Sequence, residues 1–177
     1  MTRWRVHGES PLYTSEWLSL HVARVELPNL DTFSHHVVRM SFDAAGIVIA
    51  DASRGILLLH RHRFITDTWG WEVPAGRIEA GETPQQAVER EAVEETGWRP
   101  HDIEPLGSSY PSNGQSDQLF RYFLARGATN VGEPEPDETD RVEWFSPADV
   151  RGLIATGEIT DGLSATALGI SFALGRI

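Results

Sequence analysis

Short apolar runs, in places partly alternating with polar positions, recur along the chain and predict β-strands joined by turns. Short runs rich in β-branched and aromatic residues, bounded by Gly, Pro, Asn and Asp, are typical of strands. Residues 28–31 and 51–55 supply such turns and predict two hairpins. The expected strands cover residues 17–27, 33–42, 47–50, 56–59, 71–73, 118–125 and 141–145.

Three helices are expected among these strands. Residues 83–86 carry an N-cap threonine, a first-turn proline and a reciprocal capping glutamine, and Gly97 supplies the matching stop. The helix between them has about 13 residues, roughly three to four turns. A second Ser-Pro cap opens a helix over residues 147–155, and a last helix is expected over residues 163–174. Strands interspersed with helices predict an α/β fold with a mixed sheet.

The chain is long enough for one domain with its own core, and we expect a single domain over residues 1–177. Residues 12–42 are expected as an N-terminal antiparallel strand layer before a core of residues 43–177. Such a layer is too small to bury its own apolar face. The acidic, proline-rich residues 132–140 are expected as a mobile surface loop, because a strand pattern resumes directly after them.

Charge and cysteine content narrow the classes of function. The net charge of −11 argues against a general binder of nucleic acid or of membrane surfaces, since phosphate backbones are held by positive patches. The absence of cysteine excludes disulfides and thiol chemistry. Neither a leader-like apolar region nor a run of about 20 apolar residues is present, so a cytoplasmic protein is expected.

Three glutamates share one side of the first expected helix. Glu91, Glu94 and Glu95 fall at i, i+3 and i+4, within an arc of about 100°. Carboxylates that close repel one another and shift one another's pKa values, and a hard divalent cation such as Mg²⁺ neutralises them with the oxygen ligands it prefers. Arg90 lies where it can pair with Glu82 or steer a neighbouring carboxylate. The alternative is a solvated acidic helix face, the commoner meaning of such a pattern.

The segment around these glutamates resembles the Nudix box, G-x5-E-x7-R-E-U-x-E-E-x-G-U, in which U is a bulky apolar residue. Residues 76–98 carry every fixed letter, with Ala92 and Trp98 at the U positions. This match favours a metal site over a solvated face. The resemblance implies an α/β/α sandwich and a hydrolase that uses Mg²⁺ or Mn²⁺. It also implies that Glu82 and Arg90 hold the box together while the three glutamates bind metal.

Outside the box, the chain resembles the ADP-ribose pyrophosphatase branch of the Nudix family. Residues 57–63 resemble its LLVxQYR strand, residues 72–76 match its E-x-P-A-G lead-in, and residues 157–161 resemble its G-x-I-x-D segment. In that branch the strand arginine contacts phosphate, an N-terminal aromatic residue stacks on the base, and the lead-in alanine carbonyl joins the metal shell. The corresponding residues are Arg63, Trp17 and Ala75, with Arg39 as a second phosphate candidate and Glu72 among the substrate-binding residues.

The same branch usually takes its general base from a loop late in the chain, which implies Glu138 here, with Glu135 as the second choice. It also implies a homodimer, in which the N-terminal layer crosses to the other subunit and supplies part of its substrate pocket. Simpler interpretations stay open, with Trp17 as a core residue and Arg63 as a surface charge. His60 and His62 share a strand face like a metal pair, but no third ligand accompanies them.

One loop departs from the branch. Its S-P-G-x-S-D-E pattern is replaced by S-N-G-Q-S-D-Q at residues 112–118, with Asn113 for proline and Gln118 for glutamate. The preferred hypothesis is a Mg²⁺-dependent hydrolase that cleaves the diphosphate of a nucleoside diphosphate linked to another moiety, such as ADP-ribose or a nucleotide sugar. Its partner is then a small nucleotide, not nucleic acid or a membrane. The alternatives are a Nudix hydrolase of nucleoside triphosphates and a non-catalytic module that senses a nucleotide.

Overall fold

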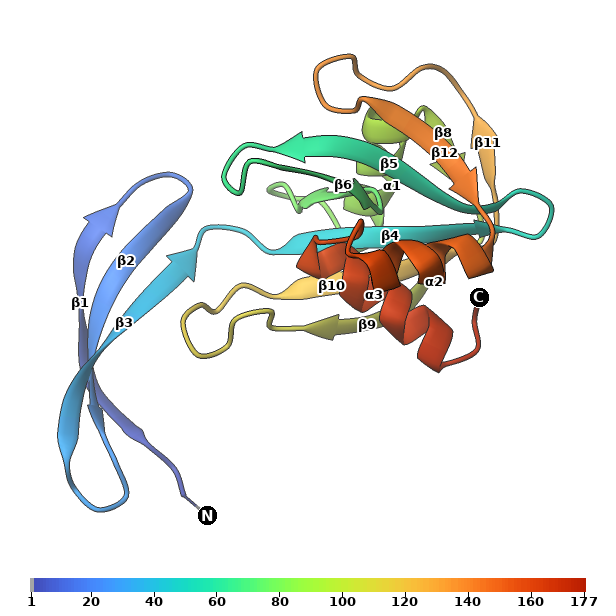
Figure 1. Cartoon of the computed structure of the whole chain (residues 1–177). Helices are drawn as coiled ribbons and strands as arrows, with labels where there is room; N and C mark the ends of the chain where they lie inside the picture. Colours follow the sequence, from blue (N-terminus) through green and yellow to red (C-terminus); the bar gives the residue numbers. More distant parts are fainter. Residues whose placement is uncertain (1) are drawn as a thin grey trace. The chain divides into compact units, whose positions relative to one another are not determined.

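The computed structural model describes residues 2–177, which divide into two compact units (Figure 1). Unit 1 comprises the chain up to Asp43 together with Tyr110–Leu119. Unit 2 comprises Ala44–Ser109 and Phe120–Ile177. The expectation that the whole chain acts as one domain stays a prediction.

Unit 1 is built on a three-stranded antiparallel sheet of β1 (Arg5–Thr14), β2 (Leu18–Glu26) and β3 (Thr32–Met40). The N-terminal antiparallel layer is therefore present, but it begins at Arg5 and not at residue 12. The sequence pattern did not predict β1, because it contains Gly8 and Pro11 and both residue types normally interrupt strands. Here they lie at two register shifts of an edge strand, where such residues are tolerated.

Unit 2 contains a mixed sheet in the order β12-β5-β4-β10-β9, with β6 added to β5 and β7 added to β4. β4 and β10 are parallel, and the other pairs are antiparallel. A separate two-stranded sheet joins β8 to β11. The bounds are β4 (Ala44–Asp51), β5 (Gly55–Arg63), β6 (Thr68–Glu72), β7 (Ala75–Arg77), β8 (Trp98–Pro100), β9 (Glu104–Ser109), β10 (Phe120–Ala125), β11 (Ala128–Asn130) and β12 (Arg141–Phe145).

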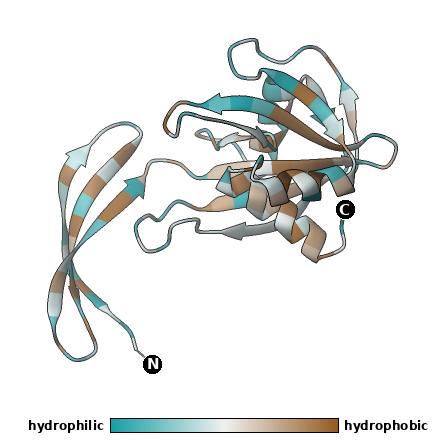
Figure 2. Cartoon of the chain, viewed as in Figure 1, coloured by the Kyte–Doolittle hydropathy of each residue, from teal (hydrophilic) through white to brown (hydrophobic). Residues whose placement is uncertain are grey.

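Helices cover both faces of this sheet. Buried Ile47, Ile49 and Leu57 pack with α1 (Pro84–Thr96), while Val48 and Leu58 pack with α2 (Pro147–Thr156) and α3 (Gly162–Ala173). Alternate residues of β4 and β5 thus feed two hydrophobic cores, which explains the continuous apolar runs in these strands (Figure 2). The predicted α/β/α sandwich is confirmed. Within residues 2–177, none of the helices is long and apolar enough to span a bilayer.

The main sheet splays open beside α1. β4 pairs with β5 only where Ile49–Asp51 meet Gly55–Leu57. Beyond that point β5 pairs with β6, while the first residues of β4 pair with β7. The polar end of β5 and the whole of β7 therefore border the same opening, and Glu91 and Glu95 of α1 lie against β7 there.

Candidate functional site

The caps of α1 fix the position of its glutamates. Thr83 Oγ1 accepts the Gln86 N–H at 3.2 Å, and Gln86 Oε1 accepts the Thr83 N–H at 2.9 Å, which completes a capping box. Gly97 closes the helix with φ 73°, a left-handed conformation that suits glycine, and its N–H donates to the Val93 carbonyl. Both boundaries expected for this helix are confirmed.

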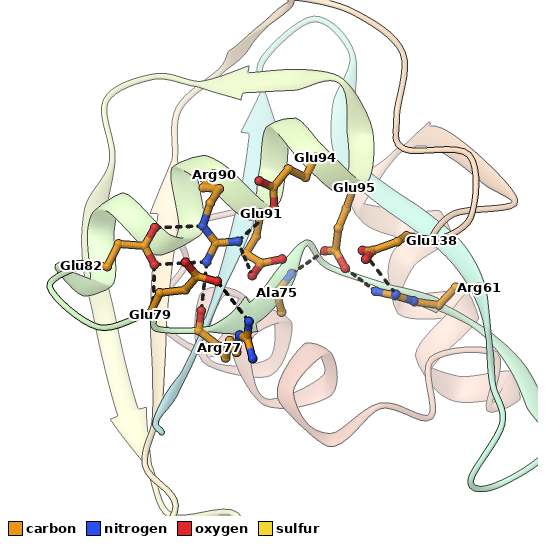
Figure 3. A network of polar contacts seen from close by, with 10 residues as sticks. All are labelled: Arg61, Ala75, Arg77, Glu79, Glu82, Arg90, Glu91, Glu94, Glu95 and Glu138. Carbon is orange, nitrogen blue, oxygen red and sulfur yellow. Dashed lines mark hydrogen bonds and ion pairs between the residues drawn. The ribbon is translucent and has the colours of Figure 1, made fainter. Parts of the chain in front are cut away.

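Gly76 leaves the space that Glu91 occupies. A Cβ atom at Gly76 would lie 2.0 Å from Glu91 Oε1. Any larger residue would therefore displace the carboxylate from the opening between β5 and β7. The neighbouring Ala75 N–H donates to Glu95 Oε2 at 2.8 Å, so β7 positions two of the three glutamates (Figure 3). The spacing of Gly76 from the helix thus has a steric cause.

Arg90 hydrogen-bonds to three glutamates, Glu82, Glu91 and Glu94. Its Nε and Nη2 donate to the two Glu82 oxygens at 2.9 and 3.1 Å, and Nη2 also donates to the Arg77 carbonyl. Its Nη1 reaches Glu91 at 2.7 Å and Glu94 at 2.9 Å. The hydrogen bond from Arg90 holds the pKa of Glu82 below its ordinary value. Arg90 therefore joins the loop before α1 to two glutamates of the helix (Figure 3).

Burial makes two of the glutamates costly to ionise. Desolvation raises the pKa of Glu91, against the opposing effect of Arg90. Glu95 is only 1% exposed, and desolvation raises its pKa to about 7 although Arg61 and the Ala75 N–H favour its ionised form. Additional positive charge at this point would offset the cost of burying two carboxylates.

Arg61 supplies the positive charge nearest to Glu95 in the structure. Its Nη1 donates to Glu95 Oε1, and its Nη2 lies 3.8 Å from Glu138 Oε2 (Figure 3). The sequence interpretation did not single out Arg61. Strand alternation carried the signal, because Arg61 shares a strand face with Leu57, which packs with α1, whereas His60 and His62 share a face with Leu58.

Arg63 and Glu72 pair across β5 and β6. Arg63 Nε donates to Glu72 Oε1 at 2.9 Å, and Nη2 donates to Oε2 at 2.5 Å, which raises the pKa of Arg63. Glu72 is 4% exposed, so it holds this guanidinium from a buried position. The pair lines a cavity of about 600 Å³, here called the Arg63 hollow, whose walls include Arg61, Arg63, Phe64, Glu72 and Asp161.

The acidic loop is anchored where α1 ends. The Glu135 N–H donates to the Glu94 carbonyl at 2.8 Å, and Thr139 Oγ1 donates to the Glu95 carbonyl at 2.8 Å. The side chain of Glu138 remains 47% exposed. A second cavity of about 400 Å³, here called the Trp69 hollow, lies between the loop and β5 and is lined by Arg61, His62, Trp69, Glu138 and Asp140. The expectation that this loop is mobile stays a prediction.

Two candidate substrate residues belong to unit 1. Trp17 is 50% exposed and meets Phe42 edge to face with ring centroids 5.8 Å apart, so it is not a fully buried core residue. Arg39 Nε and Nη2 donate to the two Glu9 oxygens at 3.0 and 2.7 Å, and Nη1 donates to Asp117 at 3.2 Å. Hydrogen bonds to Glu9 and Asp117 raise the pKa of Arg39.

The donor atoms of the helix glutamates suit a hard cation. Among residues 2–177, no three histidine or acidic side chains form a ready metal cluster, and His60 and His62 instead pack against the Trp69 ring. Arginines engage the glutamates in this arrangement. The carboxylates of Glu91 and Glu95 are nevertheless buried, and Gly76 leaves room for that of Glu91. Such oxygen ligands fit Mg²⁺ or Mn²⁺.

Comparisons with known proteins agree with this geometry. The sequence model of the NUDIX domain matches residues 40–163. The CMP-5'-(N-acetyl-N-hydroxy-3-aminopropyl)phosphonate hydrolase of Streptomyces rubellomurinus is 39% identical over 174 residues, which are 98% of this chain and 83% of that protein. The ADP-ribose pyrophosphatase of Bacillus subtilis is 28% identical over 164 residues, 91% of this chain and 88% of that protein.

A solved structure shares the fold. The crystal structure of an ADP compounds hydrolase aligns with a TM-score of 0.84, covering 99% of this chain and 97% of that one. The sequences are 17% identical, so this likeness concerns the fold alone.

Proposed function

The chain belongs to the Nudix hydrolase family, and on that premise we propose that it cleaves the diphosphate of a nucleoside diphosphate linked to another moiety, X. The observation that carries this proposal is the set of glutamates on α1, two of them buried, beside a hollow that holds Arg61 and Arg63. Acids bind the cation and arginines bind the diphosphate. All box acids are retained, which argues against a non-catalytic sensor.

The proposed metal ligands are the carboxylates of Glu91, Glu94 and Glu95 and the carbonyl of Ala75. Mg²⁺, or Mn²⁺ in its place, would polarise the phosphorus and lower the pKa of a bound water. Arg90 contributes by holding Glu91 and Glu94 in position through Nη1. Its pairing with Glu82 keeps the guanidinium itself in place.

The diphosphate is assigned to Arg63, whose planar guanidinium matches phosphate oxygens in a bidentate fashion. Glu72 orients that guanidinium from its buried position. Arg39 is the second phosphate candidate. Trp17 offers a half-exposed ring on which a nucleobase can stack, and stacking tolerates every base.

Glu138 is proposed as the general base. Its exposed carboxylate takes a proton from the attacking water, whose oxygen forms a new bond to phosphorus while the bridging P–O bond breaks. The products are a nucleoside monophosphate and the phosphate of X. The anchoring of the neighbouring Thr139 to α1 keeps this carboxylate close to Arg61 and Glu95.

The names of the relatives indicate nucleotide substrates that differ in the linked moiety X. Besides the two hydrolases above, a GDP-mannose pyrophosphatase of Yersinia enterocolitica is 27% identical over 169 residues. We therefore propose ADP-ribose or a nucleotide sugar as the substrate class. A kcat/KM panel with Mg²⁺ tests this, with ADP-ribose, nucleotide sugars, a CMP-linked phosphonate, dinucleotides and deoxynucleoside triphosphates as substrates. A preference for a triphosphate would refute the substrate class, and no turnover of any compound would refute the activity.

A further inference from the structure

We propose that Arg61 is a positioning residue that neutralises Glu95 in the cation-free protein and turns to a substrate phosphate when the cation binds. This inference rests on the proposed function, because it assumes that Glu95 is a metal ligand. It concerns a residue that stands where the resembling branch has the glutamine of its LLVxQYR strand.

The contacts of Arg61 place its charge at the centre of the acidic site. Its side chain is 15% exposed and that of Glu95 is 2% exposed, so their ion pair is largely withdrawn from water. Glu138 Oε2 lies 3.8 Å from Nη2 of the same guanidinium (Figure 3). Arg61 thus links the helix glutamate to the loop glutamate that we assign as base.

Arg61 and a cation compete for the same carboxylate. Arg61 donates to Glu95 Oε1, and the Ala75 N–H donates to Oε2, so each oxygen of Glu95 already has a donor. Each oxygen keeps a free lone pair for a cation, but a cation bound there adds a second positive charge beside the Arg61 guanidinium. The backbone N–H is held in β7, whereas the arginine side chain has rotatable bonds, so Arg61 is the group that moves. Two positive charges on one carboxylate also repel each other.

Once displaced from Glu95, the Arg61 side chain can bind a phosphate of the substrate. Its side chain lines both the Arg63 hollow and the Trp69 hollow. A diphosphate that lies between the two hollows comes within its reach, and a guanidinium freed from a carboxylate binds phosphate with the same fork of donors. Cation binding and nucleotide binding are therefore coupled through one side chain, and the coupling acts in both directions.

The test measures Mn²⁺ binding to the free protein by titration, without substrate. Arg61→Gln is expected to bind Mn²⁺ about 5-fold more tightly or better, the lower end of typical coupling between sites. Arg61→Lys keeps the charge and is expected to stay close to the unmodified protein. Arg151→Gln makes the same charge change on exposed α2, where the guanidinium lies over Phe172, and is expected to leave Mn²⁺ affinity unchanged.

A second titration includes the uncleavable probe adenosine 5′-(α,β-methylene)diphosphate. The probe is expected to tighten Mn²⁺ binding more in the unmodified protein than in Arg61→Gln, because only the former has Arg61 to release. A residue that merely stabilises the fold would not raise Mn²⁺ affinity when it is removed. Circular dichroism checks that the variants fold.

Two results overturn the inference, and they differ in what else they affect. If Arg61→Gln binds Mn²⁺ with unchanged or weaker affinity while the unmodified protein still hydrolyses its substrate, only the role of Arg61 fails. If the unmodified protein binds no Mn²⁺ at all, the metal site of the proposed function fails together with it.

Discussion

At the scale of single residues, the arrangement of the glutamates depends on a few specific contacts. Gly76 is required because a Cβ would collide with the Glu91 carboxylate. Arg90 is required because one guanidinium reaches Glu82, Glu91 and Glu94 together. The box letters and their spacing were visible in the sequence. The contact of Arg61 with Glu95 was not predicted, because alternation gives the strand face of Arg61 but not which helix residue lies opposite it.

Replacing either buried glutamate by glutamine is expected to remove activity. Glu91→Gln and Glu95→Gln each take a negative charge from the proposed cation site, and Mg²⁺-dependent turnover should fall by at least about 10²–10³-fold, the range for losing one electrostatic stabiliser. Steady-state kinetics measures this, and circular dichroism checks the fold. Glu89→Gln, on the same helix but outside the three glutamates, is the matched control. Near-normal turnover in either buried variant would contradict the metal assignment.

The Glu82–Arg90 pair is expected to make stability depend on pH. The pKa of Glu82 in the folded protein lies below its ordinary value of 4.5 because Arg90 hydrogen-bonds to it. Its stabilisation is therefore complete above about pH 4.5 and is lost as the pH falls through the lower folded-state pKa. Thermal unfolding should show Glu82→Gln less stable than the unmodified protein near neutral pH, with the difference shrinking in acid. A difference that grows in acid would oppose this reasoning.

At the scale of elements, helices and strands with strong local sequence signals were predictable, whereas short strands that pair with segments distant in the sequence were not. The capping box and Gly97 gave α1 its boundaries, and the apolar runs gave β4 and β5. The three-residue strands β7, β8 and β11 carry no period and form only because a partner strand lies beside them. Similarly, composition indicated an acidic loop at residues 132–140, but its hydrogen bonds to the end of α1 depend on the tertiary fold.

The acidic loop is expected to carry the general base. Glu138→Gln should lower kcat by about 10²–10⁴-fold, the range for a positioned acid–base group, without loss of Mn²⁺ binding. Thr139→Val removes the hydroxyl that donates to the Glu95 carbonyl, so it should lower kcat by a smaller factor through misplacement of Glu138. Thr156→Val, at an exposed position of α2, is the control. Full activity in Glu138→Gln would mean that the water is activated by the metal or by a box glutamate such as Glu94.

At the scale of the whole molecule, the three-stranded sheet of unit 1 exposes apolar side chains that a partner would cover. Val6, Leu12 and Tyr13 of β1 are all well exposed. Two or three strands alone bury little apolar surface, and exposed apolar residues on one sheet are typical of an interface. We expect a homodimer that covers this sheet. A monomeric mass by light scattering at micromolar concentration would refute the dimer and weaken the assignment of Trp17.

The most direct measurement of the central claim follows phosphorus itself. An equimolar mixture of ADP-ribose, a nucleotide sugar and a deoxynucleoside triphosphate is incubated with the protein and Mg²⁺, and the products are identified by ³¹P NMR, with a chelator control. The expected products are nucleoside monophosphates and sugar phosphates, formed only with the cation, while the triphosphate persists. Faster loss of the triphosphate, or cleavage that survives chelation of the metal, would contradict the account.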